Sequence, residues 1–190
     1  MRYSKTHKDE TRRKLMDSSR ALVKKGGFDT TGVDKLMSSI GLTSGAFYSH
    51  FPSKQALLEA VIQEEMDHSV GMLAASPDLN ADKLIKSLRL YLSHAHALHP
   101  EAGCVLPALG AEIGRSPPEV RVIVEEGLKK LQSGWASRFG SEEAAWAIVS
   151  QCVGALVLAR SVKTEKTRSE ILAANRAHLA QLLPLLLKEE

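Results

Sequence analysis

The sequence has few cysteines, few aromatic residues and no long hydrophobic run. Cys104 and Cys152 are too few for a disulfide framework, which fits a reducing, cytoplasmic setting. No apolar run approaches the roughly 20 residues that cross a bilayer, so we expect no membrane partner. The charged N-terminal residues are not followed by an apolar stretch, so we expect no secretory signal. With 44% hydrophobic and 25% charged residues, the 190-residue chain has the composition of a globular protein.

The common signatures of enzymes are missing as well. There is no glycine-rich phosphate loop, no Gly-x-Ser-x-Gly elbow and no His-Glu-x-x-His pair, so we expect neither an enzyme nor a cofactor. Three histidines, His94, His96 and His99, lie close together. On a helix His94 and His96 point to nearly opposite sides, which is poor geometry for a tetrahedral metal site. We therefore expect no metal, and a helical metal protein is kept as a less favoured alternative.

Positive charge is concentrated at the N-terminus. Residues 1–54 hold 11 Lys and Arg against 5 Asp and Glu, a net charge of +6. Residues 55–190 hold 14 against 17, a net charge of −3. A basic head on a mildly acidic body favours contact with a polyanion. Two alternatives stay open: a solvated helix surface, and an adaptor that binds acidic proteins rather than DNA.

Apolar residues follow a helical spacing almost everywhere, and no run of alternating β-branched residues indicates a strand. The sequence therefore predicts an all-α protein of about nine helices. Seven of the predicted helices span residues 8–25, 31–39, 43–49, 80–99, 103–113, 141–162 and 167–187. The other two begin at about residues 53 and 116. Ser53, Asn80 and Thr167 are the predicted N-caps of three of these helices.

Residues 28–58 have the pattern of a helix-turn-helix. Gly41 permits a sharp turn between two short helices. The second helix starts with small residues over 43–46, which let a helix N-terminus approach phosphates and base edges. Tyr48, His50 and Lys54 follow as hydrogen-bond donors of suitable reach.

Three stretches of this region resemble the TetR/AcrR family of one-component transcriptional repressors. They are GFDTT at 27–31, GLTSGAFYSHF at 41–51, and Lys54 with the pair Leu57-Leu58. The resemblance implies a three-helix DNA-binding head over residues 1–52. It also implies a larger helical body over residues 53–190 that binds a ligand and dimerises.

The same resemblance assigns roles to individual residues of the head. Phe47 and Phe51 are expected to pack inside it. Thr31 and the group Tyr48, His50 and Lys54 correspond to contacts with the phosphate backbone. The positions that approach the bases are Thr43, Ser44, Gly45 and Ala46.

In the body, a small-molecule effector is expected beside five residues: Met66, Val70, Tyr91, Cys104 and Trp135. Trp135, Phe139 and Trp146 are close in sequence and either line a cavity or serve as core and interface aromatics. Cys104 is a further candidate, because a thiol near a helix N-terminus is easily made reactive. Cys104 is read either as the sensor of an oxidant or electrophile, or as a small buried hydrophobe.

The last two predicted helices are expected to form a homodimer. Small residues such as Gly154 allow close approach, and the final helix is apolar on more than one side, including Leu179. A two-fold dimer with two heads reads a palindromic operator whose half-sites lie about 34–36 Å apart. The prediction is therefore a repressor on double-stranded DNA that a small effector releases. The alternative for the final helix is burial within a monomer.

Overall fold

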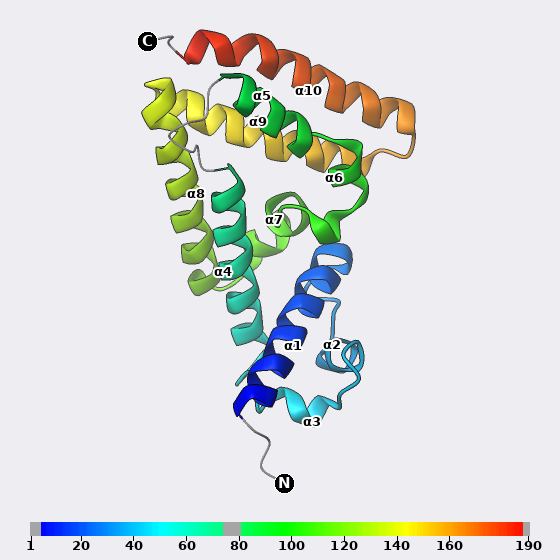
Figure 1. The fold of residues 1–190 in the computed structure, drawn as a ribbon. Helices are drawn as coiled ribbons and strands as arrows, with labels where there is room; N and C mark the ends of the chain where they lie inside the picture. The colour runs from blue at the N-terminus through cyan, green and yellow to red at the C-terminus, as the bar shows by residue number, and fades with distance from the viewer. Residues whose placement is uncertain (1–4, 74–80, 188–190) are drawn as a thin grey trace.

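The protein is described by a computed structural model that covers residues 5–73 and 81–187 (Figure 1). This part of the chain is helical and contains no strand, which confirms the all-α prediction. The helices are α1 Lys5–Gly26, α2 Val33–Ser38, α3 Ser44–Phe47, α4 Lys54–Leu73, α5 Ala81–Tyr91, α6 His94–Leu98, the 3-10 helix η1 Pro100–Ala102, α7 Leu106–Arg115, α8 Pro118–Phe139, α9 Glu142–Ser161 and α10 Glu165–Leu186.

Two of the differences from the predicted helix boundaries are explained by capping. The helix expected over 80–99 is divided into α5 and α6, because Ser93 caps a new helix by accepting a hydrogen bond from the N–H of His96. Helix α10 begins after Thr164, whose Oγ1 accepts from the N–H of Thr167, so the cap predicted at Thr167 was placed three residues late. The cap predicted at Ser53 is confirmed by its bond from the N–H of Ala56. The one predicted at Asn80 lies outside the described residues.

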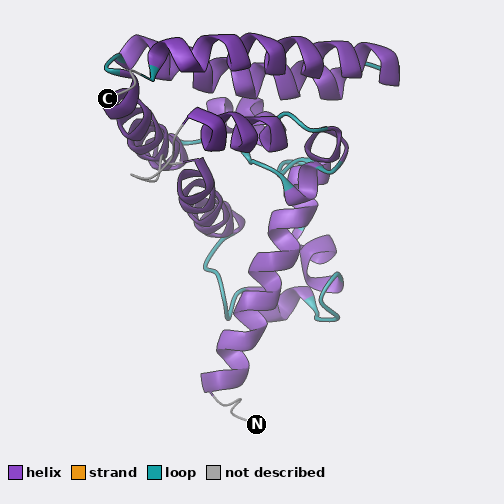
Figure 2. Ribbon diagram, turned by 45° about the horizontal axis from the view of Figure 1, so that its top comes forward, coloured by secondary structure: helices purple, strands orange, loops and turns teal. Residues whose placement is uncertain are grey.

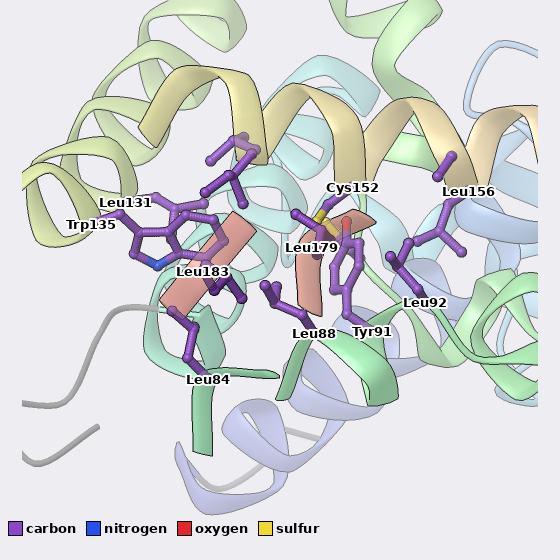
Figure 3. Packing of buried hydrophobic residues seen from close by; sticks show 14 of the residues in the cluster. Leu84, Leu88, Tyr91, Leu92, Leu131, Trp135, Cys152, Leu156, Leu179 and Leu183 are labelled. Carbon is purple, nitrogen blue, oxygen red and sulfur yellow. The ribbon is translucent and has the colours of Figure 1, made fainter. Parts of the chain in front are cut away.

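The hydrophobic interior has two parts. One lies around the head, where α1 to α4 pack together with Val105 of the turn before α7 and Val120 of α8. The other lies in the body, where side chains from α5, α8, α9 and α10 interdigitate (Figure 3). The head core includes side chains from the body, so the two predicted domains, 1–52 and 53–190, share packed side chains. The domain boundary there stays a prediction.

Helices α9 and α10 lie side by side at the end of the molecule opposite the head (Figures 1 and 2). Helix α9 is long and apolar enough to cross a membrane by composition alone. It packs against α8, α10 and α7, however, which is the position of a core helix. Leu179 of α10 is buried within the same chain. The expectation that Leu179 contributes to the dimer surface is therefore wrong, because its side chain lies in the core of one protomer.

Candidate DNA-binding head and effector cavity

The helix-turn-helix is formed by α2 and α3. Between them Gly41 has a φ of +73°, a left-handed backbone conformation that favours glycine, as predicted. The N–H of Leu42 donates to the carbonyl of Met37 at 2.9 Å and closes the turn. Leu36, Met37 and Phe47 are buried, so both short helices are fixed to the head core.

One face of α3 and its flanking residues is open to solvent. Thr43, Gly45 and Tyr48 are exposed, while Ser44 and Ala46 are half-buried. Thr43 occupies the N-cap position, yet its side chain makes no capping hydrogen bond. The Ser44 hydroxyl instead donates to a carboxylate oxygen of Asp34 on α2. The hydroxyls of Thr43 and Tyr48 are thus the better placed of the predicted contacts for an external partner.

Two of the predicted phosphate contacts make hydrogen bonds inside the head. Thr31 is fully buried and its Oγ1 donates to the carbonyl of Gly27 at 2.6 Å. The role predicted for Thr31 is therefore corrected, because this hydroxyl holds the loop after α1. Lys54 Nζ donates to the carbonyl of Phe28 at 2.8 Å and lies 4.3 Å from the centroid of its ring. An ammonium has three donors, so a phosphate contact by Lys54 stays a prediction.

Arg12 is a residue of this surface that the sequence analysis did not single out. Its Nη1 donates to the carbonyl of His50 at 2.6 Å, and its guanidinium lies 4.0 Å from the centroid of the Phe51 ring. His50 itself is half-buried. Arg13 and Lys14 follow Arg12 on α1 and are exposed. The net charge of +6 over residues 1–54 was the sequence signal for positive charge on this part of the surface.

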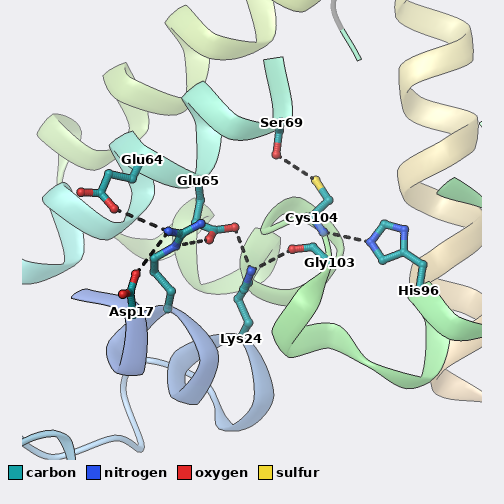
Figure 4. Close-up of polar contacts among 9 residues, drawn as sticks. Asp17, Lys24, Glu64, Glu65, Ser69, His96, Gly103 and Cys104 are labelled. Carbon is teal, nitrogen blue, oxygen red and sulfur yellow. Dashed lines mark hydrogen bonds and ion pairs between the residues drawn. The ribbon is translucent and has the colours of Figure 1, made fainter. Parts of the chain in front are cut away.

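The head is joined to the body by a buried ionic network (Figure 4). Arg20 Nε donates to Glu65 Oε1 at 2.6 Å, and Lys24 Nζ donates to Glu65 Oε2 at 2.9 Å. Lys24 Nζ also donates to the carbonyl of Gly103 at 2.9 Å. Nearby, the N–H of Phe28 donates to Glu112 of α7 at 2.7 Å. Helix α1 is therefore held by polar bonds to α4 and to the turn before α7, and the loop after α1 is held to α7.

All five residues predicted to bind an effector line one cavity. They come from α4, α5, the turn before α7, and α8: Met66, Val70, Tyr91, Cys104 and Trp135. The wall also contains Ser69, Leu88 and Cys152, which sequence reasoning missed because they are ordinary helical core positions. The cavity has a volume of only about 10 Å³, room for about one water molecule. Phe139 and Trp146 do not line it.

The polar groups of this wall are buried. Burial raises the pKa of the Tyr91 hydroxyl and raises the pKa of the Cys152 thiol to about 12, so both stay protonated at neutral pH. Cys104 is only 2% exposed and directly precedes the N-cap residue of α7. The Ser69 hydroxyl donates a hydrogen bond to Cys104 Sγ at 3.6 Å. The N–H of Cys104 donates to Nε2 of His96 at 2.9 Å.

The histidines are engaged in bonds to the protein. His96 Nδ1 lies 2.7 Å from the carbonyl of Tyr91, while Nε2 accepts from Cys104, so the ring is held in its neutral form. Burial lowers the pKa of His96 accordingly. His94 Nε2 lies 3.2 Å from the Ser169 hydroxyl. Within residues 5–73 and 81–187, no group of three or more His, Cys, Asp or Glu is placed to hold a metal.

Residues 15–61 match the family described as bacterial regulatory proteins, tetR family. This chain is 26% identical over 65 residues to the HTH-type transcriptional regulator UidR of Escherichia coli strain K12, covering 34% of this chain and 33% of UidR. It is 33% identical over 64 residues to the HTH-type transcriptional repressor Rv1474c of Mycobacterium tuberculosis, covering 34% of each. The matched part thus spans about a third of the length of these relatives.

The likeness in structure extends over nearly the whole chain. A TetR-family transcriptional regulator from Pectobacterium atrosepticum has a TM-score of 0.63 and 25% identity, covering 98% of this chain and 99% of that one. The proteins found by both comparisons are regulators, which supports the expectation that this chain is not an enzyme. Residues 15–61 therefore carry a helix-turn-helix similar to that of the tetR family of bacterial regulatory proteins, and the chain has the fold of a TetR-family regulator.

Proposed function

We propose that the protein is a cytoplasmic transcriptional repressor that binds a palindromic operator as a homodimer and is released by a small-molecule effector. The observation that carries the DNA-binding part is the exposed face of Thr43, Gly45 and Tyr48, next to which Arg12 of α1 bonds to the carbonyl of His50. Small groups at the start of α3 allow close approach to bases, while Tyr48 and the cations suit phosphates. An adaptor that binds acidic proteins would not need this arrangement of small and cationic groups.

The outer face of α9 and α10 supports the dimer. Trp146, Val157, Leu158 and Leu185 are large apolar residues exposed on this face. A Cβ added at Gly154 would meet no atom within 4 Å, so this side of α9 is open for close approach of another helix. Large apolar side chains exposed together typically mark an interface. A two-fold axis through it gives two heads and hence a palindromic operator.

The position of α4 supports release by an effector. Lys54 at its start lies in the head, while Met66 and Val70 further along line the cavity. Bound small molecules typically need about 300–1,000 Å³, far more than the present 10 Å³. An effector would therefore bind a state in which the walls, α4 among them, have moved apart. Its preference for that state sets the free energy by which it weakens operator binding.

Changes at the exposed face of α3 test DNA binding. A duplex is first selected from a randomised pool with the wild-type protein. Tyr48→Phe is expected to lower affinity about tenfold for both the selected and a scrambled duplex, because it removes one hydrogen bond to a charged phosphate. Thr43→Ala is expected to change the ranking among single-base variants of the selected duplex, because it removes a group from a base edge. Fluorescence anisotropy measures both.

Lys130→Ala provides the control, because Lys130 is exposed on α8 in the body. It should leave the affinity for both duplexes unchanged. Steep salt dependence together with sequence preference is expected of the wild type. Wild-type affinity in both α3 variants, or binding without sequence preference, would contradict the placement of the DNA interface and favour the adaptor.

The alternative trigger, covalent modification of Cys104, has its own test. Wild type, Cys104→Ser and Cys152→Ser are treated with hydrogen peroxide or N-ethylmaleimide, and operator release is followed by anisotropy. We expect Cys104→Ser to respond as the wild type does, because a thiol that is 2% exposed is poorly reached by reagents. Release that occurs in the wild type and in Cys152→Ser but is lost in Cys104→Ser would make Cys104 the sensor.

A further inference from the structure

An acidic residue lies at the helix-turn-helix of the otherwise basic head. Asp34 is in the first turn of α2 and is exposed. The hydroxyl of Ser44, at the start of α3, donates a hydrogen bond to Oδ1 of Asp34. Helices α2 and α3 lie side by side at the end of the head (Figure 1). The carboxylate is therefore held close to Thr43 and Gly45, the chain neighbours of Ser44, which are exposed on the face proposed to meet DNA.

This carboxylate has no counter-charge from the protein. None of the ion pairs among residues 5–73 and 81–187 includes Asp34. Within that part of the chain, the bond from Ser44 is the one hydrogen bond that the Asp34 side chain makes. Because Asp34 is exposed, its second oxygen, Oδ2, is left to accept a hydrogen bond from outside the protein.

The chemistry of a carboxylate limits what it can contact on DNA. An ionised carboxylate accepts hydrogen bonds and cannot donate them. It repels the phosphates, and it equally repels the acceptor atoms that guanine and thymine present in the major groove. The amino groups of cytosine and adenine are the donors there. Adenine N6 lies between two acceptors, its own N7 and O4 of the paired thymine, whereas cytosine N4 has an acceptor on one side only. A single carboxylate therefore fits cytosine best.

We propose that Asp34 recognises a cytosine in each half-site of the operator, where Oδ2 accepts a hydrogen bond from the N4 amino group. Ser44 is a positioning residue, because its hydrogen is already donated to Oδ1 and fixes the direction of the carboxylate. The assignment rests on the proposed function, since it requires this face of the head to enter the major groove. The carboxylate lowers affinity for all sequences and raises the preference for one base.

Removal of the carboxylate tests this assignment one base at a time. A duplex is selected from a randomised pool with the wild type, and all four base pairs are compared at each position by fluorescence anisotropy. The wild type is expected to prefer cytosine at one position by about tenfold, the usual size of one base contact. Asp34→Ala should reduce that preference to less than about threefold and leave the preferences at the other positions unchanged.

A scrambled duplex distinguishes base recognition from a structural role. Asp34→Ala should bind it about twofold or more tighter than the wild type does, because one negative charge near the phosphates is removed. A residue that only joins α2 to α3 would instead lose affinity for both duplexes when it is replaced. Asp34→Asn keeps an oxygen for the bond from Ser44 and presents an amide N–H outward, so its preferred base should become guanine or thymine.

Asp17 provides the matched control. It is an exposed carboxylate of α1 that pairs with Arg20, next to Glu64 of α4, rather than with a residue of α3 (Figure 4). Asp17→Asn should leave the base preference unchanged at every position. Ser44→Ala should weaken the cytosine preference at the position affected by Asp34→Ala. The double variant should show no further loss, because the two residues act through one contact.

The outcomes separate this assignment from the proposed function. A full cytosine preference in Asp34→Ala, or a loss of affinity for both the selected and the scrambled duplex, would overturn the role of Asp34. If the Thr43 and Tyr48 variants behave as expected while Asp34→Ala keeps every preference of the wild type, only this role fails. If the wild type binds without sequence preference, the DNA-binding proposal fails together with it.

Discussion

Glu65→Gln is expected to lower the free energy of unfolding by about 3–5 kcal/mol. The Glu65 side chain is only 1% exposed and accepts bonds from both Arg20 and Lys24. Lys24 is buried as well, so neutralising Glu65 leaves an ammonium in the interior without a counter-charge. Chemical denaturation of wild type and variant, followed by circular dichroism, measures the loss.

The neighbouring residue provides a matched control. Glu64 also contacts Arg20, at 3.7 Å, but its side chain is 52% exposed. Glu64→Gln should therefore cost less than about 1 kcal/mol, as exposed ion pairs do. Replacing both buried partners, Lys24→Met with Glu65→Leu, should recover much of the stability. A Glu65→Gln variant no less stable than Glu64→Gln would show that the buried network does not hold the head to the body.

This network illustrates what the sequence alone did not predict. Lys24 and Glu65 lie 41 residues apart, and each is an ordinary charged residue within a helical pattern. Nothing local indicates that their faces meet in the interior. Asp34 is equally inconspicuous, because its bond to Ser44 forms only across the turn between α2 and α3.

The helix-turn-helix was predictable because its determinants are local. The positive φ at Gly41 and the buried positions of α2 and α3 follow from spacing within a few residues. The prediction for Thr31 failed because a threonine at a loop serves equally well as a phosphate contact or as a donor to its own backbone. Only the fold shows that the bond to Gly27 is made.

The cavity residues were found for a different reason. Met66, Val70 and Tyr91 were placed on helices expected to run through the body, and long helices keep their faces over many residues. The volume of the cavity was not predictable, because it depends on how side chains from six segments of the chain pack together. The inward and outward positions of α10 were not predicted correctly, because Leu179 is buried within its own chain and Leu185 is the large apolar residue of the described part of α10 that is exposed.

If the proposed dimer forms, Val157→Asp is expected to convert it into a monomer at micromolar concentration and to weaken operator binding by at least about 100-fold. Val157 is 42% exposed on the outer face of α9, so the change leaves the core of one protomer intact. In a two-fold interface the aspartate occurs twice, and each copy is removed from water without a partner. A monomer contacts one half-site with one head, so the affinity gained by holding two heads together is lost. Sedimentation velocity gives the oligomeric state, and anisotropy gives the operator affinity.

Val122 supplies the matched control for this substitution. It is a valine of similar exposure, 50%, but lies on α8 rather than on the face of α9 and α10. Val122→Asp should remain dimeric and bind the operator as the wild type does. Gly154→Asp should behave like Val157→Asp, because it adds a charge to the same open face of α9. A wild-type monomer, or a Val157→Asp dimer with unchanged operator affinity, would move the interface elsewhere. The apolar surface formed by Trp146, Val157 and Leu158 would then need a different partner.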